Sequence, residues 1–195
     1  VFGTMTREEL NQQILQLKED FRTNLKVDTT LRAMTKLMGQ VVDSVYHQAQ
    51  NVLTPNSDDV ALLASGGFGR WELHPHSDLD LILVFANPLQ KKHETFLKSL
   101  LQPLWNLGLH IGHHILELKH YEFDPHNLEL ATALLETRLV AGNPDVYKQF
   151  LQKDVHRLFS QRRKEFLHTL VKSYEDRQKR FNSTIYQLEP DTKEA

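Results

Sequence analysis

The stretch Gly66–Leu81 (GGFGRWELHPHSDLDL) constrains the fold of this chain more than any other part of the sequence. It follows a short apolar run, Val60–Ala64, and leads into a second one, Leu79–Phe85 (LDLILVF). Short apolar runs bounded by glycine and turn residues are typical of buried strands. Successive side chains on a strand point to opposite faces, so Asp78 and Asp80 share one face of the second strand. The sequence therefore predicts a sheet in which one strand carries two adjacent carboxylates.

The two carboxylates predict a metal site. Side by side on a buried strand they repel each other, and a divalent cation would offset that cost. Oxygen ligands suit Mg²⁺ or Mn²⁺, and Mg²⁺ commonly takes one or two carboxylates together with substrate phosphates. We therefore expect Asp78 and Asp80 to hold Mg²⁺ (or Mn²⁺) and to act in catalysis. The chain contains no cysteine, which excludes disulfides and thiolate metal sites.

The glycines before the aspartates predict a phosphate-binding loop. Glycine lets the backbone come close to a ligand and turn its N–H groups toward an anion. We expect Gly66 and Gly67 to meet a triphosphate, while Ser77 either caps the strand or contacts phosphate. Arg70 either adds a positive charge for phosphate or pairs with Glu72 to brace the loop. Phosphate-binding backbone followed by metal-binding carboxylates indicates nucleotidyl transfer assisted by metal ions.

Other side chains around this loop have several interpretations. Trp71 is a lid, a stacking platform for a base, or a packing residue. His74 and His76 either contact phosphate or are ordinary loop residues. His110 and His114 share a face of a later predicted strand but lie about 13 Å apart, so we do not expect them to bind zinc together.

Helical patterns surround the predicted strands. Thr6–Glu9 has the pattern of a capping box at the start of the first helix. A third strand is expected at Leu109–Leu118, and helices are expected at residues 6–25, 29–50, 87–108, 127–141, 145–151 and 154–181. Gly108 is expected to end the third of these helices. The fold class is therefore α+β, with a small mixed sheet flanked by helices and with helical segments at both ends.

Three parts of the chain are expected from these patterns. They are an N-terminal helical segment (residues 1–55), a core that contains the sheet (56–150), and a long C-terminal helix with a tail (151–195). Both ends of the sequence look like cuts, so we expect a fragment of a longer protein.

Composition argues against several classes of partner. The 195 residues carry a formal net charge of -2, which provides no overall basic surface for a nucleic acid. No apolar run approaches the roughly 20 residues of a membrane span. The N-terminus also lacks the basic and then apolar pattern of a signal peptide. We expect a cytoplasmic protein that binds neither nucleic acid nor membrane.

The glycine loop followed by the Asp-x-Asp strand resembles the nucleotidyltransferase superfamily that includes DNA polymerase β. More narrowly, GGFGRWELHPHSDLDLILVF resembles the uridylyltransferase domain of the bifunctional uridylyltransferase/uridylyl-removing enzymes of bacterial nitrogen regulation. The later stretches LWNLGLHIGHHILEL, LATALLETRLVAG and YQLEPDTKEA resemble the same family in the same order. The resemblance runs from about Leu62 to Ala195.

This resemblance implies a polymerase β-like fold and a specific reaction. Enzymes of this family transfer UMP from UTP to a tyrosine of the trimeric PII signal protein and release pyrophosphate. By the same resemblance, Gly66 and Gly67 would hold the triphosphate, and Asp78 and Asp80 would hold Mg²⁺. We expect the family's hydrolase and glutamine-sensing regions to lie outside these residues.

Two parts of the implied function stay open. The superfamily usually has a third metal-binding carboxylate on a neighbouring strand. In the strand predicted at Leu109–Leu118, Glu117 is the one acid and therefore the candidate. The alternative is that Glu117 forms a salt bridge or lies on the surface. The acceptor could be another protein or a small molecule instead of PII. Alternatively, the chain could be a nucleotide-binding or sensor module without turnover.

Overall fold

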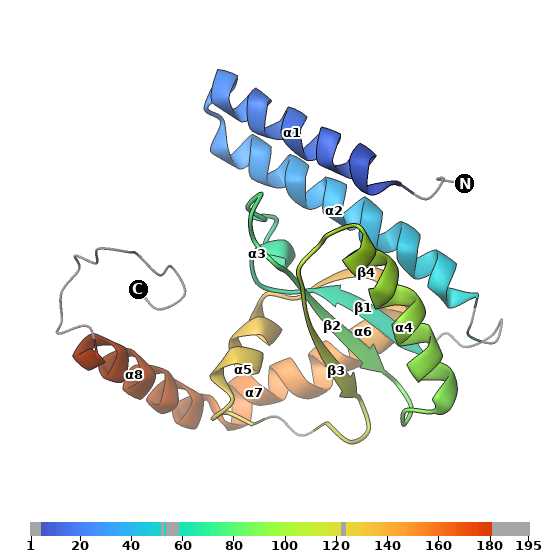
Figure 1. The fold of residues 1–195 in the computed structure, drawn as a ribbon. Helices are drawn as coiled ribbons and strands as arrows, with labels where there is room; N and C mark the ends of the chain where they lie inside the picture. Colours follow the sequence, from blue (N-terminus) through green and yellow to red (C-terminus); the bar gives the residue numbers. More distant parts are fainter. Residues whose placement is uncertain (1–4, 52, 54–58, 122–123, 181–195) are drawn as a thin grey trace.

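The computed structural model describes residues 5–51, 53, 59–121 and 124–180, and they form an α+β fold around one four-stranded sheet (Figure 1). The strands are β1 (Val60–Ala64), β2 (Leu79–Phe85), β3 (Ile111–Glu117) and β4 (Arg138–Gly142). Their order in the sheet is β3-β2-β1-β4. Strand β1 is antiparallel to β2 and β4, whereas β2 and β3 are parallel, so the sheet is mixed. The predicted fold class is confirmed.

The helices begin and end largely where local sequence signals place them. In chain order they are α1 (Arg7–Asn24), α2 (Val27–Gln50), α3 (Gly66–Gly69), α4 (Lys91–Asn106), α5 (Leu128–Leu135), α6 (Pro144–Phe150), the π-helical turn η1 (Leu151–Val155), α7 (His156–Gln161) and α8 (Arg163–Arg180). The predicted capping box is present: the Thr6 hydroxyl accepts from the Glu9 N–H, and the Glu9 carboxylate accepts from the Thr6 N–H. Gly108 follows α4 with φ 82°, as its predicted role requires.

Helices cover both faces of the sheet (Figure 1). On one face, buried side chains of α2 and α4 pack with alternate residues of β1 and β2 in a single apolar cluster. On the other face, Leu134 of α5 and Val146 and Phe150 of α6 pack against Ile82 and Val84. The alternation of β2 therefore divides its side chains between two hydrophobic layers.

The expected N-terminal segment is not separate from the core. Met34, Met38 and Val42 of α2 are almost fully buried in the same apolar cluster as Leu81 and Leu83 of β2. A boundary at residue 55 therefore does not separate two hydrophobic cores. The boundary residues 54–58 themselves, and the tail at 181–195, lie outside the described residues.

The predicted helix at residues 127–141 is wrong in its second half. Helix α5 ends at Leu135, and Arg138–Gly142 forms β4 at the edge of the sheet. Strand β4 pairs with β1, and a Cβ at Gly142 would overlap the Val60 carbonyl oxygen, so the two backbones approach closely there. Pairing with a distant strand overrides the helical pattern, which is the usual reason that propensity fails.

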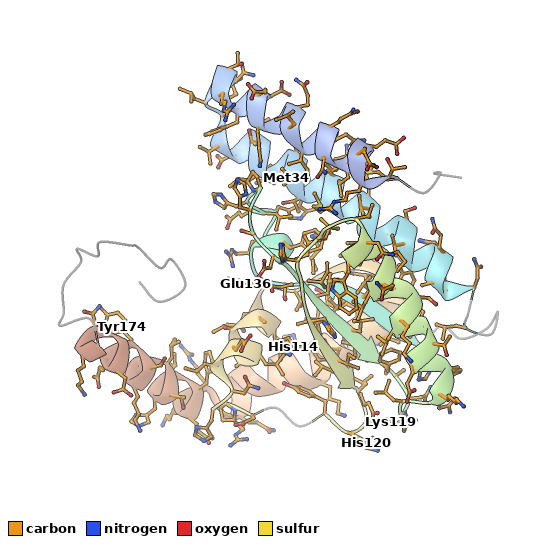
Figure 2. The ribbon with its side chains drawn as sticks, viewed as in Figure 1. Met34, His114, Lys119, His120, Glu136 and Tyr174 are labelled. Carbon is orange, nitrogen blue, oxygen red and sulfur yellow. The ribbon has the colours of Figure 1, made fainter. Side chains whose placement is uncertain are left out.

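The predicted helix at 154–181 is interrupted. Helix α7 ends at Gln161 and α8 begins at Arg163, although no glycine or proline marks the break. Leu167, Val171 and Tyr174 are exposed along α8. Tyr174 is labelled on this helix in Figure 2. Among the residues that the structure describes, no helix is long and apolar enough to cross a membrane.

Candidate functional site

The side chain of Asp80 lies over two glycines. Asp80 is the exposed residue of β2, whose other residues are buried. A Cβ added at Gly66 would lie 3.1 Å from Asp80 Oδ2, and one added at Gly112 would lie 2.8 Å from Asp80 Oδ1. Gly66 belongs to α3, and Gly112 is the residue of β3 that pairs with Asp80. The absence of side chains at both positions leaves this space to the carboxylate.

The glycine loop is tied to β2 at Asp80 itself. Strand β1 ends at Ala64, and the next residue, Ser65, donates its backbone N–H to the Asp80 carbonyl at 3.0 Å. Gly66 then has φ 56°, a conformation that glycine adopts without strain. The chain turns at once into α3, where the Gly69 N–H donates to the Ser65 carbonyl at 3.0 Å. The structure therefore brings one of the predicted glycines, Gly66, and the predicted Asp80 carboxylate together.

Asp78 and Ser77 directly precede β2. Both are exposed, and the Ser77 N–H closes a turn by donating to the His74 carbonyl at 3.1 Å. The Leu79 N–H donates to the His110 carbonyl at 2.9 Å, so the pairing with β3 begins immediately after Asp78. Two exposed carboxylates two residues apart are a donor set that fits Mg²⁺ with substrate phosphates as further ligands.

Glu117 does not join these aspartates. It pairs with Phe85, five residues along β3 from Gly112, which corresponds to about 16 Å at the usual rise per residue. Its carboxylate accepts from the Leu89 N–H at 2.9 Å and lies 2.7 Å from Nδ1 of His120. The structure therefore does not bring Glu117, predicted as a third metal ligand, to these aspartates, and its observed contact is the pair with His120. In the described part of the chain, no group of three or more His, Asp or Glu side chains is placed to hold a metal ion.

The Glu117 contacts predict a pH-dependent contribution to stability. The hydrogen bond with His120 lowers the pKa of Glu117 below the ordinary 4.5, and the Leu89 N–H lowers it further. Such a carboxylate stabilises the fold above its unfolded pKa and loses this contribution as the pH falls through its folded pKa. The stability difference between the parent and Glu117→Gln should thus be present near neutral pH and vanish in acid. Urea denaturation at several pH values measures it, and a difference that does not change with pH would contradict the assignment.

Arg70 braces the glycine loop. Its Nε donates to Glu72 Oε2 at 2.9 Å, and its Nη1 forms an ion pair with Glu136 Oε2. The hydrogen bond with Glu72, and then the contacts with Glu136, raise the pKa of Arg70. Of the two predicted roles, the structure shows pairing with Glu72. Glu136 (Figure 2) was missed because it was expected inside a helix, whereas it lies between α5 and β4.

Arg138, the first residue of β4, also contacts the glycine loop. Its Nη2 donates to the Phe68 carbonyl at 3.1 Å, and its Cζ lies 4.2 Å from the centroid of the Trp71 ring. Trp71 is 38% exposed and has φ 67°, which is uncommon for a bulky residue. Sequence reasoning missed the contact of Arg138. The apolar run after it, ended by Gly-Asn-Pro, was the available signal for a strand.

The histidines are distributed over different surroundings. His76 Nε2 lies 3.3 Å from Lys18 Nζ, so the loop before Asp78 contacts α1. His113 packs edge-on against Trp105 of α4, with ring centroids 6.4 Å apart. His114 (Figure 2) pairs with Ile82 and is half-buried on the face of the sheet that carries Asp80. The expected opposite orientation of His113 and His114 is confirmed.

Comparisons with known proteins identify a family that matches this chain. The family model described as "Putative nucleotidyltransferase DUF294" matches residues 11–112. Three relatives described as "Bifunctional uridylyltransferase/uridylyl-removing enzyme" come from Bordetella avium, Hydrogenovibrio crunogenus and Photobacterium profundum. They are 32%, 33% and 30% identical to this chain, over 90%, 90% and 97% of its length.

These relatives are much longer than the chain, which covers 20%, 19% and 21% of them. A solved structure described as "Crystal structure of the toxin-antitoxin with AMP-PNP" is similar over 65% of this chain and 97% of that chain. Its TM-score of 0.39 and identity of 11% are too low to bear on the function. The family match, in contrast, spans the glycine loop, both aspartates and Gly112, and it includes more than half of the residues. The chain therefore belongs to this nucleotidyltransferase family.

Proposed function

We propose that this chain is a metal-dependent nucleotidyltransferase domain that transfers UMP from UTP to a tyrosine of a PII signal protein and releases pyrophosphate. The observation that carries the proposal is the Asp80 carboxylate lying over Gly66 and Gly112, two residues after Asp78. Membership of the family supports nucleotidyl transfer. The choice of UTP follows from the names of the relatives, and the choice of PII follows from the resemblance to their family.

Each residue of the site has a proposed role. Asp78 and Asp80 would hold Mg²⁺ (or Mn²⁺), which when bound neutralises charge on the phosphate oxygens. Gly66 and Gly67 leave room for the triphosphate against the backbone, and Ser77 is a phosphate contact beside Asp78. Because Arg70 is paired with two carboxylates, we assign it to bracing the loop and not to binding phosphate.

The reaction is an in-line displacement at the α-phosphorus of the nucleotide. A bond forms between the tyrosine oxygen and the α-phosphorus, and the bond from the α-phosphorus to its bridging oxygen breaks. Pyrophosphate leaves with the electrons of the broken bond, and the hydroxyl proton passes to solvent. The protein contributes chiefly by positioning the triphosphate and by placing charge around it.

Calorimetric titration with UTP, ATP, CTP and GTP in the presence and absence of Mg²⁺ tests the proposal. The parent should bind UTP only with Mg²⁺, and the double variant Asp78→Asn/Asp80→Asn should lose this binding. Asp176→Asn, an exposed carboxylate on α8, is the matched control and should bind like the parent. Absence of binding of any nucleotide to folded parent protein would contradict the proposal.

A nucleotide-binding module without turnover is the second candidate. It is favoured by one observation: no third acidic side chain forms a metal-binding group with Asp78 and Asp80 within the described residues. The two candidates differ in product formation. If Mg²⁺-dependent UTP binding occurs but neither pyrophosphate nor UMP-modified PII appears, the second candidate is correct.

Gly112→Ala is expected to weaken nucleotide binding with little effect on folding. The new methyl group would lie 2.8 Å from Asp80 Oδ1, and the carboxylate, as the end of a side chain, can turn away. We expect stability to change by less than about 1 kcal/mol. The affinity for Mg²⁺ and UTP should fall by about tenfold, which corresponds to about 1.4 kcal/mol. Calorimetry and urea denaturation measure the two effects, and unchanged affinity would mean that the position of the Asp80 carboxylate is not critical.

A further inference from the structure

We propose that Arg138 is a positioning residue of the nucleotide site: from β4, its guanidinium fixes the glycine loop in the shape that places Gly66 beside Asp80. This role rests on the proposed function, because it concerns the same phosphate-binding loop. Arg138 itself has no assigned contact with nucleotide, and it acts through Phe68 and Trp71.

The guanidinium contacts the loop at two points, one before Gly69 and one after it. Before Gly69, Nη2 donates to the carbonyl of Phe68, the residue that follows Gly67. After Gly69, the guanidinium carbon lies 4.2 Å from the Trp71 ring centroid, within the range of a cation–π contact. It also lies 5.3 Å from the centroid of the Phe68 ring. One planar guanidinium therefore fixes both the position of the Phe68 carbonyl and the orientation of the Trp71 ring.

The loop lies directly on the corner between α5 and β4. A Cβ at Gly69 would overlap the carbonyl oxygen of Glu136, so backbone meets backbone there. The ion pair between Arg70 and Glu136 adds a second connection at the same corner. The loop and the start of β4 thus form one packed unit, and a change at Arg138 is transmitted to the glycines.

Arg138 is placed at a cost to stability. Burial lowers the pKa of its guanidinium, and Nε is buried without a hydrogen-bond partner among the described residues. A buried donor without a hydrogen-bond partner destabilises the folded state, because it has lost its contacts with water. The rest of β4 is Leu, Val, Ala and Gly, so an apolar residue would suit the sheet equally well. What an arginine adds at this position is the hydrogen bond to the Phe68 carbonyl and the contact with the Trp71 ring.

The backbone of Trp71 supports the same assignment. Its φ of 67° is a strained conformation for a bulky residue, of the kind that persists where the surroundings enforce it. The guanidinium over the ring is one enforcing contact. Without it, we expect Trp71 to relax toward negative φ and to shift the loop that contains Gly67.

Fluorescence gives a direct readout of this loop, because the chain contains only two tryptophans, Trp71 and Trp105. In a Trp105→Phe background, Trp71 is the single reporter. We would compare Arg138→Met, which keeps a long side chain without charge, with Arg138→Lys, which keeps the charge without the planar fork. Arg22→Met, an exposed arginine on α1, is the matched control. Circular dichroism and urea denaturation confirm that each variant is folded.

The expected result is a shift of Trp71 emission to longer wavelength in both Arg138 variants and no shift in Arg22→Met. The affinity for UTP with Mg²⁺ should fall at least tenfold in both, because lysine cannot reproduce the stacked, forked geometry. Unshifted emission with parent-like affinity in Arg138→Met, or full recovery by Arg138→Lys, would overturn the role of Arg138 and leave the proposed function intact. If the Trp105→Phe parent binds no nucleotide, the proposed function fails, and this role fails with it.

Discussion

Asp80→Asn is expected to reduce UMP transfer by about 10²–10³-fold, the loss typical of removing one preorganised charge-stabilising group. Asparagine has the shape of aspartate, so it can occupy the space over Gly66 and Gly112 without disturbing β2. It lacks the negative charge that a divalent cation requires from this position. The fold should therefore persist while turnover is lost. Steady-state release of pyrophosphate with UTP and PII, at several concentrations of Mg²⁺, measures the effect.

Two comparisons make the Asp80→Asn result interpretable. Asp78→Asn should show a loss of similar size, because the two carboxylates are proposed to act on the same cation. Glu117→Gln should retain parent activity, because Glu117 lies at the far end of β3 and is paired with His120. Near-normal turnover of Asp80→Asn would remove Asp80 from the catalytic site.

Gly69→Ala is expected to lower the free energy of unfolding by about 3 kcal/mol, the upper part of the usual range for overpacking. The added Cβ would overlap the Glu136 carbonyl oxygen and would lie 3.1 Å from the Ala64 carbonyl oxygen. Both are backbone atoms next to paired strands, so neither can move aside as a flexible side chain would. A loss of this size is a large share of the about 5–15 kcal/mol that stabilises a typical domain.

Gly39→Ala is the control for this prediction. Gly39 lies inside α2, and a Cβ there would meet no atom within 4 Å. Alanine in a helix interior is favoured over glycine by about 0.5–1 kcal/mol, so this variant should be slightly more stable than the parent. Urea denaturation of both variants measures the difference. A Gly69→Ala midpoint equal to that of the parent would show that the loop can leave the corner between α5 and β4.

The part of the site that the sequence predicts depends on local geometry. Alternation along a strand predicts Asp78 and Asp80 on one face, although Asp78 lies just before β2. The glycines before them require a turn at the end of β1. Both features extend over about 20 residues, and the structure has Gly66 beside Asp80 as a consequence. The apolar runs of β1 and β2 were recognisable for the same reason, because turn residues bound them.

The parts that were not predictable depend on pairing between distant residues. Strand β4 has a short apolar sequence that also continues a helical pattern, and only its pairing with β1 decides between the two. Glu136 and Arg138 were therefore expected on a helix, far from the loop that they contact. The distance of Glu117 from Asp80 has a related cause: the sequence shows an acid on β3 but not the register that places it opposite Phe85.

The long separation between the glycine loop and Arg138 has a consequence for synthesis. The hydrogen bond from Arg138 to Phe68 connects residues 70 positions apart. At the usual rate of translation, about 5–20 residues per second, β4 leaves the ribosome roughly 4–14 s after the loop. During that interval a nascent chain contains both aspartates but not the guanidinium over Trp71. The site should thus mature only when the edge strand docks, and a nucleotide present before then would meet a loop without its contact to Arg138.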